Sequence, residues 1–224
     1  MSYEHSEYVT SLLHKLAKTD YIRPEEVPNI DLYMDQVTTF MDSKLEAMKR
    51  NEEDKILTKT MINNYAKNNL LPPPVKKKYS KDHMLTLIFI YYFKNLMSIS
   101  DIQTILNPLT DKFFNGEGSV SMEHIYKEIY QMERKRLPVL TQEIISMFKK
   151  ANESFDNLDD NSDKDFLQMF TFICLLSFDM YMKKEMIENI IDDFATYGTF
   201  QKNTKKSDST ATPKTDKASD KKKK

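Results

Sequence analysis

The sequence predicts a mostly α-helical fold followed by a disordered basic tail. Only three of the 224 residues are glycine, whereas leucine, methionine, lysine and glutamate, which favour helices, are common. Up to about residue 200, apolar residues recur at spacings of three and four, the period of amphipathic helices. From Gln201 onward, lysine, serine, threonine, aspartate and proline replace every large apolar residue. Residues 201–224 are therefore expected to be disordered.

The N-terminal part predicts three helices before a run of prolines. Residues 3–18 place apolar side chains on one side, and Pro24 and Pro28 then interrupt the helical pattern. Asp31 is expected to cap a long second helix that continues to about residue 48. Thr58 or Thr60 then begins a third helix, which ends near residues 68–69, where asparagine suits the left-handed conformation.

The prolines at positions 72–74 cannot be helical and predict a stiff, extended exit from the third helix. A short ribbon over residues 75–79 follows, and Ser80 is expected to cap a helix whose centre, residues 84–97, is apolar on nearly every face. Ser100 with Gln103 forms a capping-box pattern for a short helix, residues 102–106, ended by Pro108.

The second half predicts further helices after a glycine-bearing loop at residues 115–119. Ser121 can cap a long helix, which Pro138 either kinks or divides. The longest apolar run, Phe166–Met182, contains Gln168 and Asp179 and is shorter than a spanning helix. A helix buried in the core is therefore expected there, with a second helix over residues 186–194.

Charge is sorted along the chain. Between residues 55 and 81 there are seven lysines and no carboxylate, whereas residues 1–54 and 82–200 are acidic overall. The formal net charge of the whole chain is only −1. A neutral protein with one lysine-rich segment presents one surface suited to an anion, and the phosphate backbone of a DNA duplex is the leading candidate.

The segment with these lysines resembles the MerR-type winged helix-turn-helix. Residues 58–71, TKTMINNYAKNNLL, are similar to the recognition-helix pattern S-x-x-T-I-R-Y-Y-E-x-x-G-L-L of that family. Residues 77–79 fall on the R-x-Y of its wing, and residues 98–102 resemble the junction that follows. Asn63 and Lys77 stand where the family has arginines, and the wing is shorter. The whole chain resembles more closely the YkrK-type Firmicute family, domain of unknown function 1836.

The helical pattern, the glycine-bearing loop, the composition of the tail and this resemblance together predict four parts of the chain. Residues 1–30 are an N-terminal helical extension, and residues 31–118 are a MerR-like winged helix-turn-helix that binds DNA. Residues 119–200 form an α-helical domain for dimerisation or sensing, and residues 201–224 are the lysine-rich tail. The expected function is a bacterial, cytoplasmic transcription regulator that reads duplex DNA with residues 58–69 and a basic wing at residues 72–81.

Eleven residues are candidates for contacts with DNA. On the helix, Lys59 and Lys67 would hold phosphates on either side of Asn63, whose amide can pair with adenine in the major groove. Wing lysines would hold the backbone beside the groove, and two tyrosines would brace phosphates through their hydroxyls, unless they pack in the core. The candidates are Lys59, Thr60, Asn63, Asn64, Tyr65, Lys67, Lys76, Lys77, Lys78, Tyr79 and Lys81.

The sequence provides little support for an enzyme. It contains no G-x-G-x-x-G motif, no Walker loop and no G-x-S-x-G, so nucleotide cradles of the first two kinds are excluded. The four histidines have no metal-ligand spacing among themselves or with Cys174, which is expected in the core. Asp159–Phe170 begins like a calcium loop but lacks its glycine and its closing glutamate. No enzymatic activity, cofactor or metal is expected.

The remaining expectations concern partners and compartment. Methionines and aromatics exceed the needs of one core stripe in the second half, so a homodimer through residues 121–200 is expected, and a small-molecule effector pocket is left open. A membrane partner is not expected. The single cysteine and the acidic N-terminus MSYEHSEY suit the cytoplasm. The alternative function is a protein–protein interaction module that kept the winged fold without reading bases.

Overall fold

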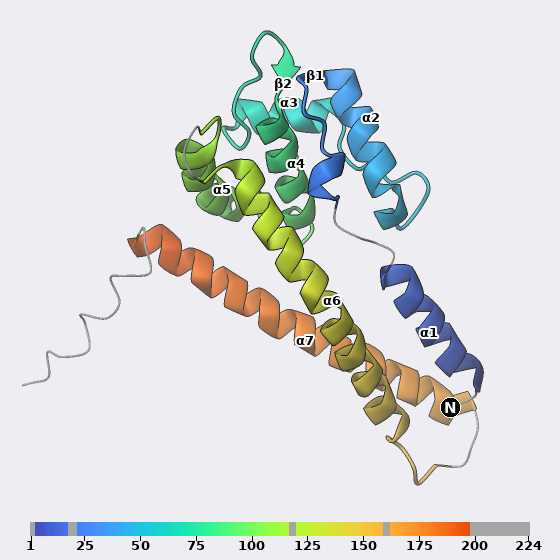
Figure 1. The fold of residues 1–224 in the computed structure, drawn as a ribbon. Coiled ribbons are helices and arrows are strands. Elements are labelled where there is room, and N and C mark those ends of the chain that lie inside the picture. Colours follow the sequence, from blue (N-terminus) through green and yellow to red (C-terminus); the bar gives the residue numbers. More distant parts are fainter. Residues whose placement is uncertain (1–2, 18–21, 117–119, 159–161, 198–224) are drawn as a thin grey trace, which may run out of the picture.

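The computed structural model describes residues 3–17, 22–116, 120–158 and 162–197, and within these ranges the chain is mostly helical (Figure 1). Seven α-helices and one two-stranded antiparallel sheet lie in the described residues. The helices are α1 (Tyr3–Ala17), α2 (Met34–Leu45), α3 (Lys59–Lys67), α4 (Lys81–Phe93), α5 (Ile99–Phe113), α6 (Met122–Asn152) and α7 (Ser162–Tyr197). The strands are β1 (Leu32–Tyr33) and β2 (Lys78–Tyr79), and short 3-10 turns cover Pro24–Glu26 and Glu46–Met48.

The main core lies in what we call the head, residues 22–130, and it is built around α4. Every residue of α4 from His83 to Tyr91 is buried, as the apolar sequence on all its faces predicts. Helices α2, α3 and α5, the sheet and the start of α6 surround it (Figure 1). Met122 and Tyr126 of α6 belong to this core, and the Tyr126 hydroxyl donates to the carbonyl oxygen of Ile22 at 2.5 Å.

A second, smaller cluster holds together what we call the arm: α1, the rest of α6, and α7. Val9 and Leu13 of α1 pack with Phe148 and Ala151 of α6 and with Phe172 of α7. In Figure 1, α6 leaves the head, the chain turns at the far end, and α7 returns past α6 until it lies next to α5. The side-chain amide of Gln168 on α7 donates to the carbonyl oxygens of Asn152 and Ser154, at 2.7 and 2.9 Å.

Several helix ends form where the sequence places them. The hydroxyl oxygen of Thr58 accepts the amide hydrogen of Met61 at 3.2 Å and caps α3. Asn69 follows that helix with a φ of 55°, the left-handed conformation expected for its asparagines. Ser121 caps α6 by accepting the amide hydrogen of His124 at 3.2 Å. Helix α4 begins directly after Ser80, as predicted.

Two predicted helix boundaries in the head are wrong. The helix expected from Asp31 begins only at Met34, because residues 32–33 pair with β2 as strand β1. The short helix expected over residues 102–106 is α5, which begins after Ser98 and continues through Pro108 to Phe113. Proline removes one backbone hydrogen bond there. The helix continues nevertheless, because Leu109 and Phe113 beyond the proline pack on the main core.

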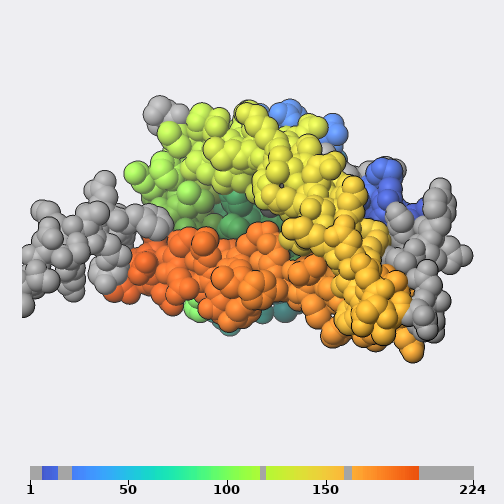
Figure 2. All heavy atoms as spheres, turned by 90° about the horizontal axis from the view of Figure 1, so that it is seen from below, coloured from blue at the N-terminus to red at the C-terminus, as the bar shows by residue number. Residues whose placement is uncertain are grey.

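The largest correction concerns α7. The sequence predicts two helices after residue 165, the first of them buried, whereas the structure has one continuous helix with much of its apolar surface exposed (Figure 2). Cys174, expected in the core, is exposed. The arm is too thin to cover a helix on all sides, so in the first half of α7 only the side with Phe172 and Gln168 is buried, and Ile191 is buried near the other end. Similarly, α6 continues unbroken through Pro138.

Judged by length and composition alone, α7 between Asp163 and Thr196 is the one described helix that meets the requirements for crossing a membrane. The predicted disordered tail, residues 201–224, lies outside the described residues, as do Asp159 and Asn161 of the loop that resembles a calcium site.

The cap of α3 generates a first prediction. Replacing Thr58 with alanine removes the hydroxyl that accepts from Met61, so the free energy of unfolding should fall by about 1 kcal/mol. Urea denaturation followed by far-UV circular dichroism measures this loss. Thr58→Ser retains a capping oxygen and is the matched control, which should lie within a few tenths of a kcal/mol of the wild type. Equal losses in both variants would contradict the capping role.

Candidate nucleic-acid interface

Helix α3 divides its surface sharply between core and solvent. Ile62 and Tyr65 are buried in the head, because they lie on the side of the helix that faces the main core. The opposite side is polar and exposed over two turns of helix. Its residues are Lys59, Thr60, Asn63, Asn64 and Lys67, five of the eleven residues that the sequence predicts for DNA contacts.

The ends of α3 are tied to neighbouring elements by hydrogen bonds. After the helix, the amides of Leu70 and Leu71 both donate to the carbonyl oxygen of Tyr65, at 2.9 and 3.2 Å. The side-chain amide of Gln103 on α5 donates to the carbonyl oxygen of Asn68 at 2.5 Å. Before the helix, the ammonium of Lys94 donates to the carbonyl oxygen of Ile56 at 2.7 Å. These bonds hold the polar face of α3 on a fixed frame.

A tight hairpin follows the three prolines and carries two of the candidate lysines at its tip. Val75 and Lys78 exchange backbone hydrogen bonds of 2.9 and 3.1 Å, which leaves Lys76 and Lys77 as the two central residues of the turn. Both have left-handed φ angles, 49° and 64°. Two-residue turns with positive φ at both positions usually contain asparagine and glycine. The two lysines are exposed to solvent and adopt a conformation that their side chains disfavour.

The base of the hairpin is anchored to the sheet and to α4. Strand β2 pairs with β1 in the register Leu32↔Tyr79 and Tyr33↔Lys78. The ring of Tyr79 is buried and meets His83 edge to face, with ring centroids 5.4 Å apart. His83 also packs edge to face on Phe114, at 4.7 Å. The exposed tip therefore extends from a base that belongs to the core.

His83 connects the start of α4 to the prolines before the hairpin. Its Nδ1 accepts the amide hydrogen of Ser80 at 3.0 Å, so the other ring nitrogen, Nε2, carries the proton and faces the carbonyl oxygen of Pro73 at 3.4 Å. Burial lowers the pKa of His83 below its ordinary value, and nearby backbone carbonyls oppose this shift only in part. The ring is held in its neutral form.

Two predicted contact residues are buried, and the contacts of their hydroxyls with phosphate stay a prediction. Tyr65 is 9% exposed and Tyr79 is 3% exposed, and both belong to the main core. Burial raises the pKa of both phenols. The alternative that these tyrosines pack in the core is confirmed.

Three of the predicted lysines have partners within the protein. Lys81 is half-buried and forms an ion pair of 3.0 Å with Glu123 at the start of α6, so it does not reach the exposed surface of the hairpin. The ammonium of Lys78 lies over the ring of Tyr33, 5.2 Å from its centroid. Lys59 forms an ion pair with Asp35 of α2, although its side chain remains largely exposed. Lys67, Lys76 and Lys77 complete the exposed cationic set.

The sequence reasoning missed the residues that position this surface. Gln103, Lys94 and Asp35 all lie outside residues 58–81. No local pattern in the sequence connects these three residues to the lysine-rich segment. No local pattern marks the left-handed turn either, because Lys76 and Lys77 are not the asparagine or glycine that such turns usually contain.

Comparison with known proteins finds a family model that matches the head. Residues 22–129 match the family described as "Domain of unknown function (DUF1836)". The match covers β1, β2, α2 to α5 and the start of α6, and it ends before the arm. It agrees with the family resemblance found in the sequence. No match was found among curated proteins or among solved structures. Within the described residues, no group of three or more histidine, cysteine, aspartate or glutamate side chains is placed to hold a metal ion.

The buried histidine beneath the hairpin generates a second prediction. Because the folded state lowers the pKa of His83, the unfolded chain binds its proton more readily. The contribution of neutral His83 to stability is therefore present above a pH of about 6.5 and is lost as the pH falls from there toward the lowered pKa. The urea concentration at the midpoint of unfolding should therefore fall as the pH is lowered from 7 to 5.

His83→Asn is the control, because an asparagine oxygen can accept from the Ser80 amide without titrating. Its urea midpoint should fall less over the same pH range. A fall as steep as that of the wild type would show that other groups cause the pH dependence.

Proposed function

We propose that the DUF1836 head is a MerR-like winged helix that binds duplex DNA, and that the chain acts as a non-enzymatic transcription regulator. One observation carries the proposal. The polar face of α3 and the lysine turn at residues 76–77 both belong to the head, and both are exposed to solvent. A helix for the major groove beside a basic hairpin for the backbone is the arrangement that winged-helix readers use.

The order of elements supports this assignment. Strand β1, helices α2 and α3, the hairpin with β2, and helix α4 follow one another in the head, and β1 pairs with β2 beside the hairpin. In one respect the arrangement is unusual. Residues 46–58 separate α2 from α3, whereas helix-turn-helix motifs commonly use three or four residues. The α3 end of this connection is fixed by Lys94 and Thr58.

Base reading is assigned to the centre of the α3 face. Asn63 lies between Lys59 and Lys67 on the exposed side, with Asn64 next to it. An asparagine amide can donate to and accept from the edge of adenine at the same time, which is a contact that specifies a base. Lys67, Lys76 and Lys77 would neutralise phosphates on either side, and lysine contacts of this kind position the protein without reading sequence.

The conformation of the turn adds a separate argument. Lys76 and Lys77 occupy left-handed positions where asparagine and glycine are easier to accommodate. A residue that keeps an unfavourable backbone conformation points to a role for its side chain. Two adjacent ammonium groups at the tip of a hairpin serve binding to an anion, since they contribute nothing to the core.

The alternative is an interaction module that binds an acidic protein surface through the same face. The ion pair between Lys59 and Asp35 favours it, because this lysine already has an anionic partner. The absence of arginine from α3 also favours it, since arginine provides most specific base contacts. A protein partner would require the same lysines but would not produce the salt dependence expected for a duplex.

The DNA proposal predicts a defined dependence on salt. Four exposed lysines at residues 59, 67, 76 and 77 that neutralise phosphates give a slope of log affinity against log salt of about −3 to −4 per protomer. Fluorescence anisotropy with a random-sequence duplex at several salt concentrations measures it. Replacing both Lys76 and Lys77 with glutamine should weaken binding and reduce the slope by about 2.

The matched control replaces Lys149 and Lys150, an exposed adjacent pair at the far end of α6, with glutamine. This variant carries the same change of net charge and should bind with an unchanged slope. Equal effects of the two double variants, or an affinity independent of salt, would refute duplex binding by this surface.

The turn itself generates a further prediction. Exchanging Lys76 for asparagine and Lys77 for glycine suits the left-handed conformation, so the free energy of unfolding should rise by about 1 kcal/mol. The same double variant should bind DNA more weakly, because both charges are lost. Urea denaturation and anisotropy measure the two effects. A variant that is both more stable and equally tight in DNA binding would remove these lysines from the interface.

A further inference from the structure

Helix α7 carries an apolar stripe on the side that faces away from the arm's core. The stripe consists of Phe166, Phe170, Ile173, Cys174, Met180 and Tyr181. Its five large side chains are between 54% and 68% exposed, and Cys174 is also exposed. Figure 2 shows α7 crossing this face of the molecule with its outer surface uncovered. Large apolar side chains gathered in this way mark a contact surface.

The spacing of the stripe suits a second helix. Phe166, Phe170, Ile173, Ser177 and Met180 follow one another at steps of four, three, four and three residues, all exposed. On a helix of 3.6 residues per turn these positions lie within about 80° of one another. The step of four and three is the seam of paired helices, in which side chains of one helix fill the gaps of the other.

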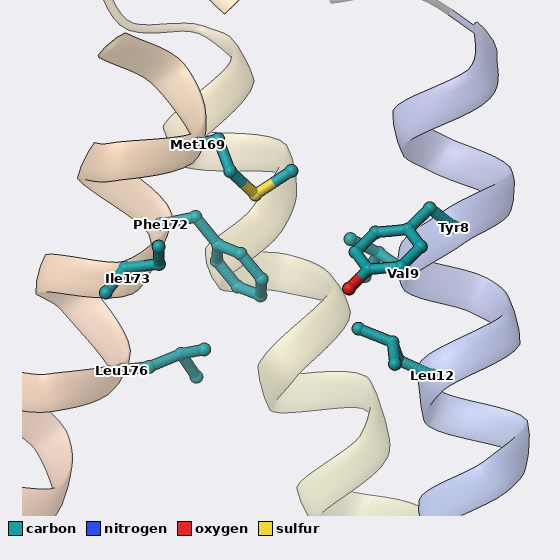
Figure 3. A pocket seen from close by; sticks show the side chains of 7 residues that line it. All are labelled: Tyr8, Val9, Leu12, Met169, Phe172, Ile173 and Leu176. Atoms are coloured by element: carbon teal, nitrogen blue, oxygen red, sulfur yellow. The ribbon is translucent and has the colours of Figure 1, made fainter. Parts of the chain in front are cut away.

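A groove extends this surface toward α1. Its cavity of about 600 Å³ is lined by Tyr8, Val9 and Leu12 of α1 and by Met169, Phe172, Ile173 and Leu176 of α7 (Figure 3). Ile173 belongs to both the groove and the stripe, so the two are continuous. Tyr8 and Leu12 are also exposed. The apolar area available to a partner is therefore wider than a single helix.

Two opposite charges, Asp163 and Lys184, lie symmetrically beyond the two ends of the stripe, and Lys184 also pairs with Glu188 of its own helix. Asp163 lies three residues before Phe166, and Lys184 lies three residues after Tyr181. The midpoint of both pairs falls between Ile173 and Cys174. When two copies of α7 align in opposite directions about that midpoint, Asp163 of one copy lies opposite Lys184 of the other. When they align in the same direction, Asp163 meets Asp163 and Lys184 meets Lys184, so like charges lie opposite each other.

The charge of α7 disfavours a lipid surface. The helix carries seven carboxylates and three lysines. Helices that lie on membranes are typically rich in lysine or arginine on their polar side, because the lipid headgroups they meet are often anionic. Asp179 lies within the apolar segment and forms an ion pair of 2.5 Å with Lys183.

We propose that the stripe on α7 pairs antiparallel with the same stripe of a second copy, and that the two-fold axis passes beside Ile173 and Cys174. Pairing from Asp163 to Lys184 covers about 30 Å of helix in each copy. The adjoining groove widens the apolar surface beyond the stripe itself. A symmetric dimer buries the same patch on both copies. The pairing does not depend on DNA binding by the head.

Light scattering of the full chain at micromolar concentration tests the pairing. The expected mass is twice the 26.4 kDa of one chain. Phe170→Glu and Ile173→Glu each place a carboxylate in the seam and should weaken dimerisation about tenfold or more. Met186→Glu is the matched control, because Met186 is 65% exposed but lies on another side of α7. Far-UV circular dichroism checks that each variant retains its helices.

Disulfide trapping tests the direction of the pairing. Phe166→Cys and Tyr181→Cys are introduced separately into Cys174→Ser chains of different tagged lengths, and the two are mixed under mild oxidation. Antiparallel pairing predicts a disulfide between a Phe166→Cys chain and a Tyr181→Cys chain. It predicts none between two Phe166→Cys chains or between two Tyr181→Cys chains. In the wild type, Cys174 lies beside the axis and should link two copies.

Three results would overturn the proposal. The first is a single-chain mass at micromolar concentration, and the second is a dimer that neither glutamate variant weakens. The third is a disulfide between two Phe166→Cys chains with none between a Phe166→Cys chain and a Tyr181→Cys chain. A single-chain mass together with sedimentation on anionic vesicles would assign the stripe to a membrane instead. Salt-dependent DNA binding by the Ile173→Glu variant would separate the failure of this proposal from the failure of the proposed function.

Discussion

The burial of α4 on nearly all its sides is the constraint from which the arrangement of the head follows. A helix that is apolar all round must be surrounded, and α2, α3, α5, the sheet and the start of α6 do so. Tyr65 and Tyr79 are part of that enclosure. The face of α3 opposite Tyr65 and the hairpin that precedes Tyr79 are consequently directed outward, so packing of the core determines which polar groups a ligand can meet.

The arm follows a different logic. Its core is a small cluster of five buried side chains and one amide that bonds to two carbonyls, and it leaves most of α7 uncovered. Too little of the described chain lies beside α7 to cover this helix, so its apolar stripe is exposed. The self-pairing that we propose would cover the stripe with no new sequence, since the covering surface is the same stripe in a second copy.

Local signals in the sequence were sufficient where one residue decides the outcome. Thr58, Asn69 and Ser121 end or begin helices because each meets a backbone requirement that few other residues meet. Signals failed where distant packing decides. Pro108 lies inside α5 because Leu109 and Phe113 reach the core, and α7 is exposed because little of the chain remains to cover it. Neither fact is visible in a local pattern.

The candidate surface shows the same division. The exposed positions of Asn63, Lys67 and Lys77 follow from helical period and turn composition, so sequence reasoning reaches them. The burial of Tyr65 and Tyr79, and the ion pairs of Lys59 and Lys81, depend on which elements lie next to them in space. Residue type alone does not distinguish a tyrosine or lysine that contacts a ligand from one that contacts a neighbouring residue of the protein.

Helix α6 has a mechanical consequence. Its first turns belong to the core of the head through Met122 and Tyr126, and its last turns belong to the cluster of the arm through Phe148 and Ala151. It runs unbroken between them for 31 residues, about 45 Å. A rod of that length works as a lever: a tilt of about 5° at one end displaces the other by about 4 Å. A rearrangement that tilts α6 at the far end of the arm would therefore move Tyr126 and the carbonyl of Ile22 that it holds.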